Sequence, residues 1–131
     1  MLDTHVLLWL DAASPRLGKR AIKVIEGAHQ AGEVMVSSIS FWEIGTLLRK
    51  GRIELEMDLT AWRSELLEQG VVELPVTGEI GVRAAALHEF GGNPADRLIA
   101  ATALQNGLSL VTADKAILAS PLQSRMINAA E

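Results

Sequence analysis

The sequence predicts an α/β fold, with a small, mostly parallel sheet flanked by helices. Short apolar runs alternate with longer amphipathic segments along all 131 residues, which is the pattern of parallel strands joined by helices. The run 108–112 is mostly apolar, as expected of a strand covered on both faces. No repeat, linker or low-complexity segment interrupts this order, so we expect one domain over residues 1–131.

The N-terminal third begins with a clipped strand. Only two residues precede Asp3, so a strand that leads into it is short. We expect a helix to begin in the apolar run 6–10 and to end before Pro15. Ser14 and Pro15 then predict the N-cap and first position of a second helix, which continues to about residue 29, because the missing N–H of proline is tolerated there.

Caps, breakers and β-branched residues place the remaining elements. We expect strands over residues 34–37, 71–76 and 108–112, and an edge strand over 125–128. We expect helices over residues 40–50, from Asp58 or Thr60 to 69, from Thr77 to about 89 and from Asn93 to Gly107, with a loop at 90–92 and a short helical turn from Asp114 to 119.

The composition is that of a folded protein without disulfides. Hydrophobic residues make up 49% and charged residues 21% of the chain, which excludes a disordered protein. No apolar run approaches the roughly 20 residues that span a bilayer, and Asp3 in the opening segment argues against a signal peptide. The absence of cysteine excludes thiolate nucleophiles and Cys-based zinc sites, and it is compatible with the cytoplasm.

The net charge of −4 argues against non-specific clamping of nucleic acid as the main activity, but it allows one local basic patch. Two small basic groups stand out: Arg16, Lys19, Arg20 and Lys23, and Arg49, Lys50 and Arg52. Each is more often a solvated helix face or end than a binding site. Trp9, Trp42 and Trp62 fall on apolar faces and are expected to pack, while an exposed one would offer a surface for base stacking.

Acidic residues are expected to gather at one edge of the sheet. They are Asp3 after the first strand, Glu43 in the first turn of the helix after the second strand, Asp96 in the first turn of a later helix, and Asp114 just past the strand 108–112. Strand C-termini and the N-termini of the helices that follow them share one edge, which is where open α/β sheets bind ligands. These four acids therefore converge in the predicted fold.

Crowded carboxylates repel one another, and this raises their pKa values unless a cation neutralises them. Mg²⁺ and Mn²⁺ bind carboxylate oxygens and retain several waters. Such an ion lowers the pKa of a bound water and stabilises charge on a phosphoryl oxygen. One interpretation of the cluster is therefore a divalent metal site.

The other interpretation is structural. Ser40 and Glu43 fit a capping box, in which the glutamate reaches back to the Ser40 N–H. An acid in a first turn, such as Asp96, is favoured by the helix dipole, and Asp114 fits a cap of the following turn. Each acid taken singly is more often structural than catalytic, so the pattern alone leaves both interpretations open.

Four segments carry a resemblance to a known family. They cover almost the whole chain in the family's order: DTHVLLWL at Asp3, SISFWEIGTLLRKG around Glu43, PADRLIAATA at Asp96 and LVTADKAI at Asp114. Together they look like a PIN domain, and more closely they resemble the VapC toxins of bacterial toxin–antitoxin pairs. The combination of PADRLIAATA with TAD is the most specific part. The resemblance implies a three-layer α/β/α fold and a metal-dependent endoribonuclease.

The resemblance also implies roles for single residues. One or two Mg²⁺ or Mn²⁺ ions would be held by Asp3, Glu43, Asp96 and Asp114. A metal-bound water would attack an RNA phosphodiester in line, leaving a 5′-phosphate on the downstream fragment. Small polar positions that in the family line the site and orient acids or water are matched by Thr4, Ser38 and Thr112. Family members usually form homodimers whose active-site groove is covered by an antitoxin, so RNA, a cognate antitoxin and a second copy are the implied partners, in the cytoplasm and away from membranes.

Other positions near the motifs are assigned more ordinary roles. Arg97 stands where the family usually has arginine, and a structural ion pair is expected of it rather than contact with RNA. His5 is expected at the surface or the edge of the core, since no second histidine lies at ligand spacing. Asn93 stands where close relatives often have aspartate, which lowers the charge at the mouth of the site. The family also has a longer first strand, which raises the question of how firmly Asp3 is held.

Two alternatives come from other functional classes. The first is a PIN-fold module that binds metal or RNA without cutting, and the short first strand is its support. The second is a receiver-type domain, which also clusters acids at strand ends to bind Mg²⁺. The receiver-type domain is discounted because it needs a lysine at the end of a late strand, and Lys115 does not fit that pattern.

Overall fold

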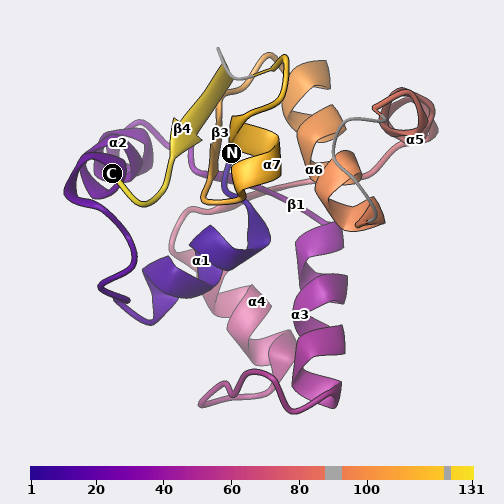
Figure 1. Ribbon diagram of the computed structural model, residues 1–131. Helices are drawn as coiled ribbons and strands as arrows, with labels where there is room; N and C mark the ends of the chain where they lie inside the picture. The colour runs from indigo at the N-terminus through magenta and orange to yellow at the C-terminus, as the bar shows by residue number, and fades with distance from the viewer. Residues whose placement is uncertain (88–92, 123–124) are drawn as a thin grey trace.

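The computed structural model describes residues 1–87, 93–122 and 125–131. Within these ranges the chain forms seven helices and four short strands (Figure 1). The helices are α1 (Thr4–Asp11), α2 (Lys19–Gln30), α3 (Ile39–Arg49), α4 (Leu59–Glu68), α5 (Gly78–Ala85), α6 (Pro94–Gln105) and α7 (Lys115–Leu118). The strands are β1 (Met35–Ser37), β2 (Val72–Leu74), β3 (Leu110–Thr112) and β4 (Met126–Asn128).

The sheet is organised around Leu2, a single bridge residue that stands in the place of the predicted first strand. β1 pairs in parallel with β2, and β3 pairs in parallel with β4. Leu2 bridges Val36 of β1 on one side and Val111 of β3 on the other, again in parallel. The order across the sheet is therefore β2, β1, Leu2, β3 and β4. This confirms the predicted parallel sheet and its short first member.

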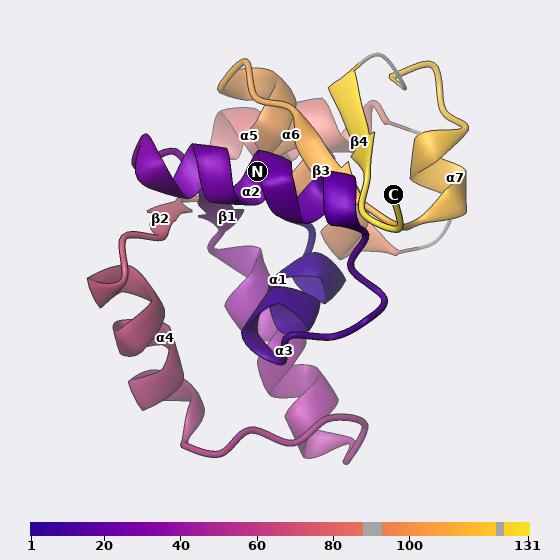
Figure 2. The ribbon, with the colours of Figure 1, turned by 90° about the vertical axis from the view of Figure 1, so that its left-hand side faces the viewer.

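Different helices cover the two faces of the sheet. Leu2, Val36 and Val111 belong to a core cluster with residues of α1 and α2. Leu110, the neighbour of Val111 in β3, packs instead with Ile99 of α6. Successive strand residues point to opposite faces, so the two clusters lie on opposite sides of the sheet, and Figure 2 shows α2 on one side and α6 on the other. The predicted three-layer α/β/α arrangement is confirmed.

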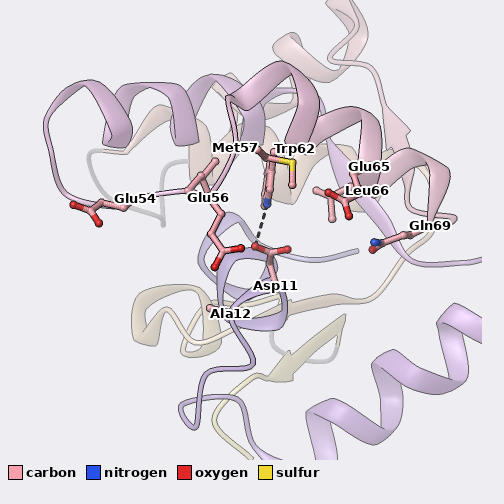
Figure 3. A pocket seen from close by; sticks show the side chains of 10 residues that line it. Asp11, Ala12, Glu54, Glu56, Met57, Trp62, Glu65, Leu66 and Gln69 are labelled. Atoms are coloured by element: carbon pink, nitrogen blue, oxygen red, sulfur yellow. Dashed lines mark hydrogen bonds between the residues drawn. The ribbon is translucent and has the colours of Figure 1, made fainter.

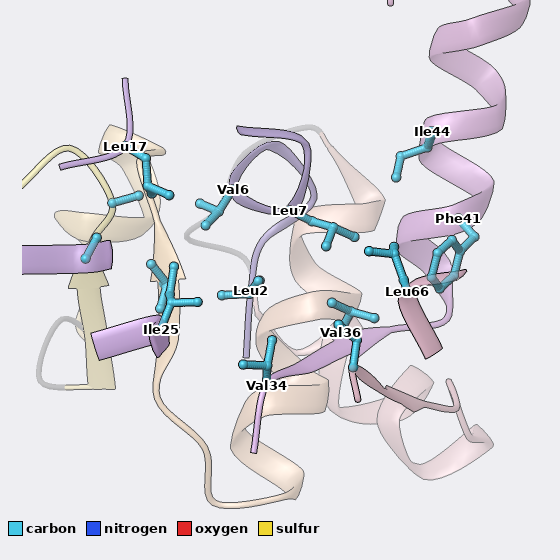
Figure 4. Close-up of a cluster of buried hydrophobic side chains, with 14 of the residues drawn as sticks. Leu2, Val6, Leu7, Leu17, Ile25, Val34, Val36, Phe41, Ile44 and Leu66 are labelled. Carbon is cyan, nitrogen blue, oxygen red and sulfur yellow. The ribbon is translucent and has the colours of Figure 1, made fainter. Parts of the chain in front are cut away.

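The larger core extends from the sheet towards α3 and α4 (Figure 4). Phe41 of α3 and Trp62 of α4 meet edge to face, with ring centroids 6.1 Å apart. Trp62 is buried and Trp9 is half-buried against this core, as expected. Trp42 is 63% exposed, so the prediction that it packs inside was wrong.

The second helix begins at Lys19 and not at Pro15, which corrects the predicted start. The backbone N–H of Gly18 donates to the Ala129 carbonyl at 2.8 Å, and the N–H of Arg20 donates to the Glu131 carbonyl at 2.8 Å. Amides of the first turn thus find acceptors on a segment more than 100 residues away in sequence. This tertiary contact, which Ser14 and Pro15 do not reveal, sets the start of α2.

The remaining boundaries follow the sequence closely. Asp58 caps α4 by accepting from the Ala61 N–H, and Thr77 caps α5 by accepting from the Ile80 N–H. The helix expected from Thr77 to about 89 ends earlier, at Ala85, and residues 88–92, including the expected loop, lie outside the described ranges. The predicted edge strand is confirmed as β4. In the described part of the chain, no helix has the length and apolarity needed to cross a membrane.

Candidate metal centre

Asp3 is the most firmly held of the four acids. It is 4% exposed and is the N-cap of α1, where Oδ1 accepts from the Thr4 N–H at 2.7 Å. Its Oδ2 accepts from Thr112 Oγ1 of β3 at 2.7 Å. The backbone N–H of Asp3 also donates to the Val111 carbonyl at 3.0 Å. A single bridging residue before Asp3 is therefore enough to fix this carboxylate at the edge of the sheet.

Thr4 connects Asp3 to Glu43 of α3. Its Oγ1 donates to Glu43 Oε1 at 2.6 Å, and a second hydrogen bond of 2.9 Å joins it to Ser40 Oγ. A hydroxyl has one proton, so both bonds form when Ser40 donates to Thr4 and Thr4 donates to Glu43. Thr4 and Ser40 are both buried, which shields this chain of hydrogen bonds from water.

The predicted capping box at the start of α3 is not formed. The helix begins at Ile39 with Ser38 as its N-cap, so Ser40 lies inside the first turn. Residues three apart share a helix face, and the serine and Glu43 both meet Thr4 on that face. The Ser-x-x-Glu spacing was therefore a signal for a polar cluster, and Ser40 is the site residue that the sequence analysis missed. Ser38 Oγ accepts instead from the Val76 N–H at 3.2 Å.

Thr112 connects Asp3 to Asp114. The Asp114 N–H donates to Thr112 Oγ1 at 3.1 Å, while the same hydroxyl donates to Asp3. Asp114 caps α7, because its Oδ1 accepts from the N–H groups of Ala116 at 2.8 Å and Ile117 at 3.1 Å. Its Oδ2 accepts no hydrogen bond from the described residues. The capping interpretation of Asp114 is right, and it leaves one carboxylate oxygen available.

Asp96 completes the group from the first turn of α6, whose N-cap Asn93 accepts from the Ala95 N–H at 3.1 Å. Burial raises the pKa of Asp96 to about 7, and the charges of the three other acids add to the shift. Burial also raises the pKa of Asp3, against the opposing hydrogen bonds from Thr112 and Thr4. The charges of Asp3, Glu43 and Asp114, which come from three other segments of the chain, thus reach Asp96 in the folded protein.

The donor chemistry of this group fits a hard divalent cation. Carboxylate oxygens are the ligands that Mg²⁺ and Mn²⁺ prefer, and a cation would relieve the repulsion that raises the pKa of Asp96. The present side-chain arrangement is not yet a ligand set, since no three Asp, Glu or His side chains of the described residues are positioned to hold an ion. Protein donors occupy both carboxylate oxygens of Asp3, one of Glu43 and one of Asp114.

Two basic residues stand close to the motif acids in the sequence, Arg97 next to Asp96 and His5 two positions after Asp3. Arg97 is half-buried and forms no ion pair with any residue of 1–87, 93–122 or 125–131, so the ion pair expected of it is not found there. His5 is exposed, as expected, and its charge lowers the pKa of Asp3. His29 is remote and bonds to the Gln69 carbonyl.

The fold and the site together define a three-layer α/β/α protein with an acidic centre at the carboxyl edge of a parallel sheet. The family model described as PIN domain matches residues 1–120, and the chain belongs to this family. Ribonuclease VapC22 of Mycobacterium tuberculosis (strain ATCC 25618 / H37Rv) is 39% identical over 116 residues, which cover 88% of this chain and 86% of that protein. The predicted similarity to VapC proteins is thus confirmed.

The fold also recurs in a solved structure. A chain of a toxin-antitoxin complex from Klebsiella pneumoniae superimposes with a TM-score of 0.63, covering 97% of this chain and 94% of that chain. The two are 21% identical in sequence, so this likeness supports the fold.

Proposed function

We propose that the chain, acting as one domain over residues 1–131, is a Mg²⁺- or Mn²⁺-dependent endoribonuclease that serves as a toxin and is neutralised by an antitoxin. The observation that carries the proposal is the convergence of four acids from four separate segments on one edge of the sheet. The extended similarity to Ribonuclease VapC22 supports RNA as the substrate, because it covers most of both proteins.

In this proposal the ion is held by Asp3, Glu43, Asp96 and Asp114. When bound, it would supply a water of lowered pKa and would stabilise charge on the phosphoryl oxygens of an RNA phosphodiester. Asp3 acts as the fixed anchor, because two donors and a buried backbone hold it. Thr4 hydrogen-bonds to Glu43, and Thr112 accepts from the Asp114 N–H, so the two threonines fix the positions of these acids relative to Asp3. Ser38 contributes indirectly, by fixing the end of β1.

The protonation state of Asp96 controls whether the proposed metal site is occupied. With a pKa of about 7 it carries a proton in a large fraction of molecules at neutral pH. A cation must displace that proton, so metal binding releases protons and strengthens as the pH rises. Glu43 and Asp114 each keep one carboxylate oxygen that accepts no hydrogen bond from the described residues.

A metal titration of the pure, antitoxin-free protein tests the proposal. Thermal stability and cleavage of a mixed small-RNA pool are followed together as Mg²⁺ or Mn²⁺ is added and then removed with EDTA. We expect the ion to raise the melting temperature and to switch on cleavage, and Asp96→Asn to lose both effects. Asp58→Asn is the matched control, because this exposed cap lies outside the cluster and asparagine caps equally well.

A second candidate is a PIN-fold module that binds metal or RNA without cutting it. This candidate rests on the short first strand, although two hydrogen bonds hold the Asp3 carboxylate in place. It predicts that the ion stabilises the protein while the RNA pool stays intact. If the ion neither stabilises the protein nor activates cleavage, the acids are caps and both candidates fail.

The proposal includes a homodimer, a cognate antitoxin that covers the active-site groove, and a cytoplasmic setting. These features follow from the resemblance to VapC toxins. Sedimentation velocity of the pure chain tests the homodimer, for which we expect one species of about twice the monomer mass. A monomer at micromolar concentration would contradict this part of the proposal alone.

A further inference from the structure

We propose that a cavity between α1 and the segment 47–55 binds one nucleotide of single-stranded RNA next to the acidic centre. The inference rests on the proposed function and deepens it by assigning a substrate subsite. The cavity has a volume of about 510 Å³. The residues on which the inference depends are His5, Trp9, Arg16, Leu47, Arg52 and Ile53, all of which line it.

The cavity adjoins the acids through α1. Asp3 caps this helix, and His5, Leu8 and Trp9 follow at the spacing that places side chains on one helix face. All three line the cavity. The helix rises 1.5 Å per residue, so His5 and Trp9 are separated by about 6 Å along its axis. A strand whose phosphate lies at Asp3 therefore has an adjoining nucleotide within reach of this face.

Two arginines from distant parts of the sequence meet at the cavity. Arg16 follows α1, and Arg52 follows α3. Both are exposed, and neither forms an ion pair with a described residue, in contrast to Arg20 and Arg63. Guanidinium groups bind phosphate through paired hydrogen bonds. Asp11 and Glu54 line the same cavity, so the inference depends on the two guanidinium groups as local phosphate ligands and not on a net positive charge.

The floor of the cavity suits a base. Trp9, Leu47 and Ile53 are half-buried apolar side chains that line it. An indole stacks with any base, because every base has a π-face. Asp11 and Glu54 also line the cavity, and carboxylates accept hydrogen bonds from exocyclic amino groups such as that of cytosine. The cavity thus offers separate groups for phosphate and for base.

A second cavity next to the first is lined by acids, and it blocks the path of an RNA strand in that direction. It shares Asp11 and Glu54 with the first cavity and adds Glu56 and Glu65 (Figure 3). Its tryptophan, Trp62, donates from Nε1 to Asp11 Oδ2 at 3.0 Å. A phosphate is repelled by this group of carboxylates. Asp11 and Glu54, which line both cavities, therefore limit the nucleotide to the first cavity.

RNA binding by variants tests the subsite. Arg16→Gln, Arg52→Gln and the double variant are made in an Asp96→Asn background, so that binding is measured without cleavage. Arg83→Gln is the matched control, because this exposed arginine of α5 loses the same charge outside the cavity. The probe is a fluorescein-labelled mixed-sequence RNA 10-mer, followed by anisotropy at 50 to 200 mM salt.

We expect each cavity variant to bind the RNA about 3- to 10-fold more weakly. The double variant should lower the slope of log affinity against log salt by about 0.7, the contribution of one neutralised phosphate on a single strand, because both arginines bind the phosphate of the same nucleotide. Arg83→Gln should match its background. Trp9→Phe should retain binding and Trp9→Leu should weaken it, with urea midpoints confirming that all variants fold.

Kinetics in the active protein separate this inference from the proposed function. Arg16→Gln and Arg52→Gln should raise KM for RNA and leave kcat within about twofold. If the wild type cuts nothing, the proposed ribonuclease fails while the binding assay still decides the subsite. If both cavity variants bind RNA as Arg83→Gln does, the subsite is overturned and the cavity is left to a protein ligand.

Discussion

Asp96→Asn should make the metal-free protein more stable above neutral pH, although it removes a residue of the proposed centre. Asp96 is half-buried and faces the field of three other carboxylates, and burial with this field raises its pKa from 3.8 to about 7. The native state therefore holds a proton that the unfolded chain releases between pH 4 and 7. The free energy of unfolding must fall as the pH rises through this window.

The magnitude follows from the shift. A difference of about 3 pKa units corresponds to an upper limit of about 4 kcal/mol at 1.36 kcal/mol per unit. Asp96 is only half-buried, so screening by solvent lowers the expected value to about 1–2 kcal/mol. An uncharged amide of the same shape removes this penalty. We expect Asp96→Asn to raise the free energy of unfolding by about 1–2 kcal/mol at pH 8 and to leave it unchanged at pH 4.

Urea denaturation in EDTA at pH 4 and pH 8 measures this difference, with Asp58→Asn as the control that changes at neither pH. Added Mg²⁺ should reverse the order at pH 8, because the wild type gains the binding energy of the ion and the variant does not. A variant that is equally destabilised at both pH values would refute the reasoning, since it would mean that Asp96 supports the start of α6 rather than a crowded acidic cluster.

Two further substitutions test the framework around the site. Thr112→Val removes the donor to Asp3 Oδ2. It should lower the free energy of unfolding by about 1–3 kcal/mol, because a buried acceptor is left unpaired. Unchanged urea midpoints would show that water replaces the hydroxyl. Gly18→Ala places a methyl group against the backbone of Ala130 and Glu131. This overpacking should lower the free energy of unfolding by about 1–3 kcal/mol, measured as a lower melting temperature. Wild-type stability would show that the C-terminal segment moves aside freely.

An acid that caps a helix and an acid that binds a metal occupy the same place in the sequence pattern. The sequence therefore left the role of each acid open. Asp114 caps α7 with one oxygen, and its charge also raises the pKa of Asp96. Asp3 caps α1 and also accepts from β3. An acid at a helix start serves both purposes, because the N–H groups of the first turn and a cation both attract negative charge.

The sequence by itself determined the fold class, the order of the elements, and the four segments that carry the acids. These features depend on local patterns, namely apolar runs, caps such as Asn93 and Thr77, and breakers such as Gly107. The motifs around the acids also led directly to the PIN domain family. The sequence was least informative where one pattern has two uses, as at Ser40 and Glu43.

Only the tertiary structure decided which side chains meet. The hydrogen bond from Thr4 to Glu43 joins residues 39 positions apart, and that from Thr112 to Asp3 joins residues 109 apart. The start of α2 at Lys19 depends on carbonyls of the C-terminal segment. The exposure of Trp42 and the meeting of Arg16 with Arg52 at one cavity also arise from packing. Such contacts leave no local pattern, because they form only when distant elements dock on the sheet.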